Sequence, residues 1–242
     1  MNNGHTRSSN DTGVLAAAAA ALEFVVDGAC VGLGSGRASS AFIRALGERC
    51  RDGLRVRGVA TSSASATLAI SVGIPLIGIE DGLLLELTVD GADEVAPNLD
   101  MVKGWGGALV RERIVAAASK RQVILVGADK LVSTIGERGR VPVEVIPLAQ
   151  WPVTRELLAI GLAPTLRMDS AGASPYVTDN GNVIIDFAVR APIADGIAAR
   201  SLERAVLDIV GVVDTGLFLG TADRVLVGHS DGRVETLRRI VG

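Results

Sequence analysis

Short apolar runs alternate with amphipathic stretches along the first part of this 242-residue chain. Strands are expected over residues 30–33, 55–60, 75–79, 85–89 and 122–126, and helices over about 14–26, 39–51, 63–72 and 109–119. Strands that alternate with helices are typical of βα units, in which successive strands lie parallel and helices cover both faces of the sheet. The pattern therefore predicts an α/β domain built on a largely parallel, doubly wound sheet.

The pattern changes after residues 136–140. Strands are expected at 143–147, 164–168, 183–189 and 212–218, with helices near 152–160 and 195–210. This order, β-α-β-β-α-β, predicts a smaller ferredoxin-like α+β domain. Residues 222–237 then return to the first domain. We therefore expect a first domain of residues 14–138 and 219–242, an inserted domain of residues 139–218, and a disordered polar leader at 1–13.

Composition narrows the classes of protein that fit. Hydrophobic residues make up 48% of the chain and aromatic residues 3%, so an aliphatic core is expected. A net charge of -3 argues against nucleic acid as the main partner, because phosphate backbones require a basic surface. Residues 14–22 are as apolar as an export signal, but Glu23 and a buried strand follow, which favours a helix. We expect a cytoplasmic protein with no membrane partner.

Cysteine and histidine are scarce. The cysteines Cys30 and Cys50 form no C-x-x-C pattern, and the histidines are His5 and His229. We therefore expect neither a disulfide nor a metal site, and most Ser–His, Cys–His and zinc-hydrolase schemes are excluded. Acid–base chemistry is left to carboxylates and lysines.

A glycine-rich loop separates the expected strand at 30–33 from the helix that follows. Its sequence, Gly32-Leu33-Gly34-Ser35-Gly36-Arg37, lets the backbone approach an anion at the start of a helix. The spacing fits neither a P-loop nor a dinucleotide-binding fingerprint. The loop is either a phosphate contact or a plain tight turn.

Two further segments carry charged groups. Asp90-Gly91-Ala92-Asp93-Glu94 follows a strand, where ligands bind in open α/β sheets, although a solvated turn is the alternative. Lys103 begins a glycine-rich loop that leads into a helix with Glu112 in its first turn, where helix capping is the alternative. A carboxylate base, a cation and an anion-binding loop together suit proton transfer between adjacent carbons of a phosphorylated sugar.

Six motifs resemble those of the ribose-5-phosphate isomerase A family and occur in the same order along the chain. They are DGADE (90–94), K-G-x-G-G-A-L-x-R-E (103–112), ADK (128–130), VPVEVIP (141–147), TDNGNVIIDF (178–187) and GVVDTGLF (211–218). The resemblance covers about residues 14–237. It implies a Rossmann-like domain with an inserted ferredoxin-like domain, assembled into homodimers or homotetramers. It also implies cofactor-free, metal-free interconversion of ribose 5-phosphate and ribulose 5-phosphate through an enediolate.

The resemblance also implies residue roles. Glu112 falls on the proton-abstracting glutamate, Asp90 and Asp93 on acids that contact sugar hydroxyls and assist ring opening, and Lys103 on the lysine near the reacting oxygens. The implied substrate-binding residues are Ser35, Gly36, Arg37, Ala38, Gly91, Ala92, Gly104, Trp105, Gly106 and Lys130.

Two loops depart from the family pattern. Where the family usually reads G-T-G-S-T, this chain reads Gly34-Ser35-Gly36-Arg37-Ala38. Where the family reads K-G-G-G, this chain reads Lys103-Gly104-Trp105-Gly106. The guanidinium of Arg37 can replace lost hydroxyl contacts with an anion clamp, or it can pair with a surface acid. These changes leave two alternative functions open: an isomerase of a different small sugar phosphate, and a non-catalytic sugar-phosphate sensor. A deaminase of amino-sugar phosphates is disfavoured, since no histidine lies near these loops.

Overall fold

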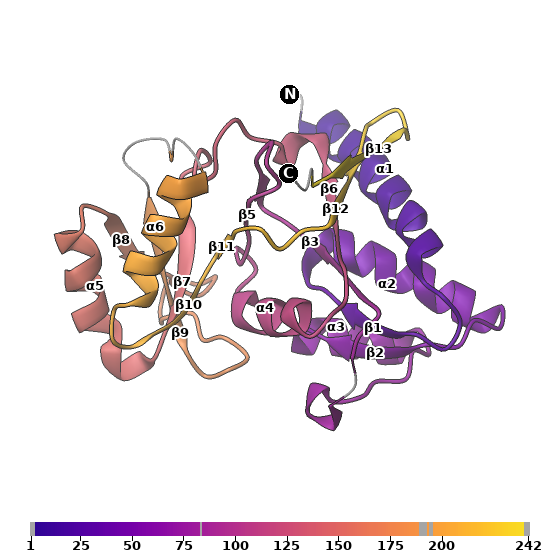
Figure 1. Cartoon of the computed structure of the whole chain (residues 1–242), viewed down its shortest axis with the longest axis horizontal. Coiled ribbons are helices and arrows are strands. Elements are labelled where there is room, and N and C mark those ends of the chain that lie inside the picture. The colour runs from indigo at the N-terminus through magenta and orange to yellow at the C-terminus, as the bar shows by residue number, and fades with distance from the viewer. Residues whose placement is uncertain (1–2, 83, 189–192, 194–195, 240–242) are drawn as a thin grey trace. The chain divides into compact units, whose positions relative to one another are not determined.

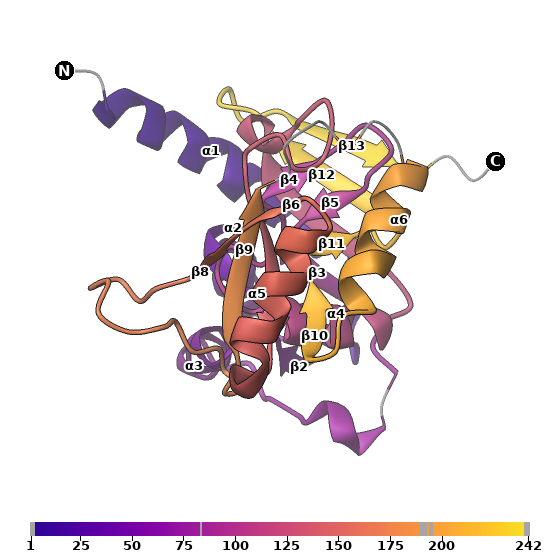
Figure 2. The same ribbon diagram turned by 90° about the vertical axis from the view of Figure 1, so that its left-hand side faces the viewer.

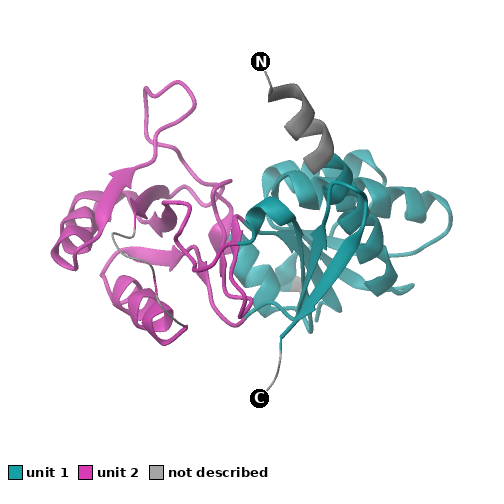
Figure 3. Ribbon diagram, turned by 90° about the horizontal axis from the view of Figure 1, so that it is seen from above, with its two compact units in different colours: residues 1–92, 111–131, 221–242 teal, residues 93–110, 132–220 magenta. Residues whose placement is uncertain are grey.

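The computed structural model describes residues 3–82, 84–188, 193 and 196–239 (Figure 1). The chain forms two compact units (Figure 3). Unit 1 comprises Met1–Ala92, Arg111–Leu131 and Thr221–Gly242, and unit 2 comprises Asp93–Val110 and Val132–Gly220. Residues 93–110 thus fall in unit 2, whereas the sequence assigned them to the first domain. The domain division itself stays a prediction.

Unit 1 contains a six-stranded sheet in the order β13-β12-β6-β3-β1-β2, parallel throughout except for the outer strand β13. Every residue of β6 is buried, as expected for a strand covered on both faces. The predicted parallel sheet and the return of the last segment to it are confirmed. The strands are β1 (Cys30–Leu33), β2 (Arg57–Ala60), β3 (Leu87–Gly91), β6 (Gln122–Gly127), β12 (Arg224–Gly228) and β13 (Val234–Arg238).

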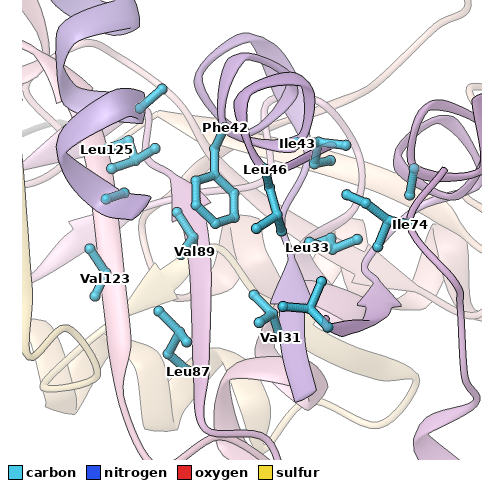
Figure 4. Close-up of a cluster of buried hydrophobic side chains, with 14 of the residues drawn as sticks. Val31, Leu33, Phe42, Ile43, Leu46, Ile74, Leu87, Val89, Val123 and Leu125 are labelled. Carbon is cyan, nitrogen blue, oxygen red and sulfur yellow. The ribbon is translucent and has the colours of Figure 1, made fainter. Parts of the chain in front are cut away.

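Aliphatic side chains between α2 and the sheet form the core of unit 1. Phe42 and Leu46 of α2 pack with Leu33, Val89 and Leu125 from three neighbouring strands (Figure 4). Burial of each such side chain contributes about 1.5–3 kcal/mol, so this interface fixes the start of α2 next to the strand ends. The helices are α1 (Asn3–Ala21), α2 (Gly36–Arg51), α3 (Ser63–Ser71) and α4 (Leu109–Ala117).

Two predictions for this part of the chain are wrong. Residues 3–13 belong to α1, whereas a disordered leader was expected; residues 1–2 lie outside the described part. The alanine-rich stretch nucleates a helix, and extension of an existing helix costs less than nucleation. The expected strand at 75–79 forms only one bridge, from Leu76 to Gly58. Pro75 lacks an N–H, so the segment cannot add a full ladder to the edge strand β2.

Unit 2 has the predicted ferredoxin-like order, with an antiparallel sheet arranged β10-β7-β9-β8. Both helices pack against the face that carries Val141, Val143 and Val145 of β7 (Figure 2). Side chains alternate along a strand, so Glu144 lies on the opposite face. The elements are β7 (Val141–Val145), α5 (Gln150–Ala159), β8 (Ala163–Leu166), β9 (Val183–Ala188), α6 (Gly196–Leu207) and β10 (Val212–Thr215).

Short elements complete the fold. A three-stranded sheet in unit 2 has the order β11-β5-β4, with β4 (Glu94–Val95), β5 (Met101–Val102) and β11 (Leu217–Phe218). The 3-10 helices are η1 (Leu22–Phe24), η2 (Ile79–Asp81), η3 (Ala128–Lys130) and η4 (Pro147–Ala149). The parts of our predictions that fall on residues 189, 195 and 240–242 lie outside the described residues.

Candidate active site

Asp90 ties the end of β3 to the glycine-rich loop between β1 and α2. Its carboxylate is fully buried, and Oδ1 accepts hydrogen bonds from the backbone N–H of Ser35 (3.0 Å), the hydroxyl of Ser39 (3.0 Å) and the N–H of Gly91 (2.7 Å). Three donors on one carboxylate oxygen hold it in a single orientation. The structure thus brings Ser35, Asp90 and Gly91 together at the carboxyl ends of two adjacent strands.

A cluster of hydroxyl groups lies against the same loop. The Oγ of Ser35 is 2.8 Å from both Thr61 Oγ1 and Ser62 Oγ, and Ser65 donates its hydroxyl to the carbonyl of Gly34 (2.6 Å). Ser62 also caps α3 by accepting the N–H of Ser65. Thr61, Ser62 and Ser65 were not predicted from the sequence as site residues. The serine and threonine run at 61–67 was a signal, but hydroxyls are equally common as helix caps.

The other predicted residues of this loop take different positions. Ala38 lies close to Gly91, since a β-carbon added to that glycine would be 3.8 Å from the Ala38 β-carbon. Arg37 forms an ion pair with Asp11 at 3.1 Å, and both side chains are 55% exposed. An exposed pair of this kind is weak. The role of Arg37 in substrate binding stays a prediction.

Glu112 lies in the first turn of α4, as predicted, and its side chain is 5% exposed. The carboxyl end of α4 leads into the start of β6. The first turn of the helix therefore lies toward the other end of the strands, the edge of the sheet formed by their carboxyl ends. That edge also carries Asp90, at the end of β3, and Lys130, which is half-buried in η3 directly after β6. Topology thus places a carboxylate and a lysine where parallel sheets bind ligands.

Lys103 occupies a buried position in unit 2. Its side chain is 2% exposed, and the ammonium lies 5.4 Å from the centre of the Phe218 ring. The backbone N–H donates to the carbonyl of Gly216 at 2.9 Å. A cation over an aromatic face in a dry setting is attracted to the ring quadrupole, so Phe218 helps to hold the ammonium.

The loop after Lys103 contains Trp105, whose side chain is held against residues 138–140. The indole N–H donates to the carbonyl of Arg140 (3.1 Å), and the guanidinium groups of Arg140 and Arg138 lie 4.6 Å and 5.7 Å from the ring centre. The backbone N–H of Trp105 donates to Oδ2 of Asp93 at 2.9 Å. Asp93 and Trp105 are therefore brought together within unit 2.

Tyr176 supports the same loop from the segment that follows β8. Its hydroxyl donates to the carbonyl of Gly106 at 3.3 Å. Burial raises the pKa of Tyr176 above its ordinary value, and the nearby Asp179 adds to the rise. The phenol therefore remains a neutral donor at physiological pH.

No cluster of three or more histidine, cysteine, aspartate or glutamate side chains with metal-binding geometry occurs in the described part of the chain. In the same residues, no helix has the length and hydropathy of a membrane span.

Comparison with known proteins decides the family. The family described as ribose 5-phosphate isomerase A (phosphoriboisomerase A) matches residues 57–232. This chain belongs to the ribose 5-phosphate isomerase A family. Ribose-5-phosphate isomerase A from Roseiflexus castenholzii is 44% identical over 223 residues, which are 90% of this chain and 92% of the relative. The relative of the same name from Thermomicrobium roseum is 46% identical over 217 residues, or 89% and 90% of the two chains.

Solved structures of ribose 5-phosphate isomerases share the fold. The isomerase A from Methanocaldococcus jannaschii has a TM-score of 0.88 and 40% identity over 95% of this chain and 99% of its own. A D-ribose-5-phosphate isomerase in complex with phospho-erythronic acid has a TM-score of 0.88 and 37% identity over 93% and 97% of the two chains. The predicted family and the predicted fold class are confirmed, and the predicted enzyme class, an aldose–ketose isomerase, is that of the family.

Proposed function

We propose that the protein interconverts ribose 5-phosphate and ribulose 5-phosphate. The observation that carries this proposal is the buried Glu112 carboxylate in the first turn of α4, at the ligand-binding edge of the sheet, in a chain of this family. A carboxylate that is shielded from water and sits at such an edge is suited to act as a base toward carbon.

In the proposed mechanism Glu112 removes the proton from C2 of the open-chain aldose. The electron pair of that C–H bond forms the C1–C2 double bond, and the carbonyl oxygen becomes the oxyanion of an enediolate. Return of the proton to C1, with transfer of the O2 hydroxyl proton to O1, gives the ketose. The ammonium of Lys103 stabilises the oxyanion, because a cation in a dry site interacts strongly with developing charge.

We assign the remaining groups to binding and ring opening. Asp90 and Asp93 contact the sugar hydroxyls and assist ring opening, and Lys130 binds the substrate. The loop at Ser35–Ala38 contacts the phosphate, which is supported by the start of α2 and by the hydroxyls gathered around Ser35. The other loop residues that we assign to substrate binding are Gly91, Ala92, Gly104, Trp105 and Gly106.

The substitution Glu112→Gln tests the proposed function. The amide keeps the shape of the side chain but cannot accept a carbon-bound proton, so kcat should fall roughly a hundredfold or more while binding is kept. The measurements are turnover of ribose 5-phosphate in the presence of EDTA and direct binding of phospho-erythronic acid, the ligand of a relative. Retention of more than about a tenth of kcat would remove Glu112 as the base.

Two alternatives predict different results. A non-catalytic sensor would bind ribose 5-phosphate without turning it over, and an isomerase of another sugar phosphate would prefer a different member of a substrate panel. Membership of the family disfavours both.

We further propose that the enzyme works in the cytoplasm and assembles as a homodimer or homotetramer, as the family resemblance implies. Cell fractionation measures the compartment. Analytical ultracentrifugation measures the assembly.

A further inference from the structure

A largely buried ion pair lies next to the loop that follows Lys103. Arg167, directly after β8, meets Asp186 of β9 with both Nε and Nη2, and the Nε–Oδ2 distance is 2.8 Å. The two side chains are 10% and 13% exposed. A two-point contact between guanidinium and carboxylate fixes the plane of the guanidinium.

The remaining terminal nitrogen of Arg167 points at the loop. Its Nη1 donates to the carbonyls of Gly104 and Trp105, each at 3.0 Å. The loop is not part of a strand, and Gly104 has a φ of 95°, in the left-handed region that favours glycine. The carbonyl of Gly104 also accepts the N–H of Gly107 at 3.0 Å, so this turn and the Arg167 guanidinium together determine where the carbonyls lie.

One peptide group links Arg167 to Asp93. The carbonyl of Gly104 accepts from Arg167, and the N–H of the same peptide, which belongs to Trp105, donates to Oδ2 of Asp93. The orientation of this peptide plane consequently sets the direction of the hydrogen bond to Asp93. Chained hydrogen bonds of this kind also strengthen each other.

We propose that Arg167, oriented by Asp186, is a positioning residue that fixes the Gly104–Trp105 peptide and so sets the placement of Asp93 and Lys103 for isomerisation. This inference rests on the proposed function. It predicts that the planar fork of arginine is required and that a positive charge alone is not sufficient. Lysine has three donors on one nitrogen, so it cannot make the four hydrogen bonds that the guanidinium makes from three nitrogens.

Fluorescence of Trp105 tests the inference without any activity assay. The chain has two tryptophans, so Trp151→Phe leaves Trp105 as the sole reporter. In that background, Arg167→Lys should shift the Trp105 emission to longer wavelength and raise its acrylamide quenching constant about twofold, because the loop loosens. Asp186→Asn provides a second, milder variant that keeps the guanidinium, and it should move both readings in the same direction.

Arg155→Lys is the matched control. Arg155 also meets a carboxylate with Nε and Nη2, both at Oε1 of Glu156, but the two side chains are 62% and 46% exposed and no loop carbonyl is involved. The control should change neither the Trp105 emission nor the kinetics. Thermal unfolding of each variant identifies any loss of folded protein.

Kinetics then separate positioning from mere stability. With folded variants, kcat for ribose 5-phosphate should fall roughly ten- to a hundredfold in Arg167→Lys, since small misplacements of catalytic groups have effects of this size, with KM changed less than about threefold. Unchanged Trp105 fluorescence, or an unchanged kcat despite altered fluorescence, would overturn the inference. If the parent enzyme does not isomerise ribose 5-phosphate, the proposed function fails, and the fluorescence still decides whether Arg167 fixes the loop.

Discussion

The carboxylate of Asp90 occupies the space that a side chain at position 34 would need. A β-carbon added to Gly34 would lie 2.1 Å from Oδ1 of Asp90, the oxygen that holds Ser35, Ser39 and Gly91. Glycine at this position is therefore required by a contact with the site, in addition to any freedom that its backbone provides.

Gly34→Ala should displace the Asp90 carboxylate and loosen the loop. Overpacking of this kind costs about 1–3 kcal/mol, measured by urea unfolding. Gly106→Ala is the control, because no atom lies within 4 Å of an added β-carbon there. Equal stabilities of the two variants would show that Asp90 moves aside without cost.

Lys103→Met should reduce kcat roughly a hundredfold or more while KM changes less, because the ammonium is proposed to act on charge that develops in the transition state. Methionine retains most of the apolar stem beside Phe218. Steady-state kinetics on ribose 5-phosphate measure the split. An effect confined to KM would reassign Lys103 to ground-state binding.

Arg37→Ser should raise KM for the sugar phosphate about tenfold or more with little change in kcat, if the guanidinium exchanges Asp11 for the phosphate. Asp11→Asn releases Arg37 and should lower KM or leave it unchanged. If Arg37→Ser has the kinetics of the parent enzyme, the guanidinium serves only the surface ion pair.

The stability contribution of Glu94 should depend on pH. Burial raises the pKa of Glu94 above its ordinary value, against hydrogen bonds from the N–H groups of Arg138 and Gly136. The folded state therefore holds the proton more tightly than the unfolded state, so stability from Glu94 is lost as the pH rises through the raised pKa.

Comparison of the parent with Glu94→Gln isolates this effect. As the pH rises from about 5 to 8, the unfolding free energy of the parent should fall relative to that of Glu94→Gln. The lost hydrogen bond adds a constant offset that does not change this trend. Glu48→Gln, at an exposed position, is the control for the substitution itself. A shift in the opposite direction would mean that the pKa of Glu94 is lowered by folding.

Sequence predicted the elements whose signal is local. The buried runs at 30–33 and 122–126 became β1 and β6, because strands covered on both faces read as continuous apolar segments. The segment at 75–79 is also apolar, but Pro75 prevents a ladder, and the turn chemistry outweighed hydrophobicity there.

The missed site residues have a different cause. Arg167 reaches a loop more than 60 positions earlier in the chain, and nothing near it in sequence marks that partner. The contact depends on the register of β8 against β9, which brings Thr165 opposite Asp186. Partners set by sheet register cannot be read from a local pattern.

The close approach of α1 to β12 has a consequence for how the chain is made. A β-carbon on Gly13 would lie 2.6 Å from the carbonyl oxygen of Gly228, so the first helix packs directly on a strand from the last part of the chain. The ferredoxin-like sheet, by contrast, uses strands that follow one another from β7 to β10. During synthesis that sheet can form before residues 221–242 emerge. Until then, α1 and β6 lack β12, the strand that both contact. A chain that stops short of β12 therefore leaves an open parallel edge, which is a template for aggregation.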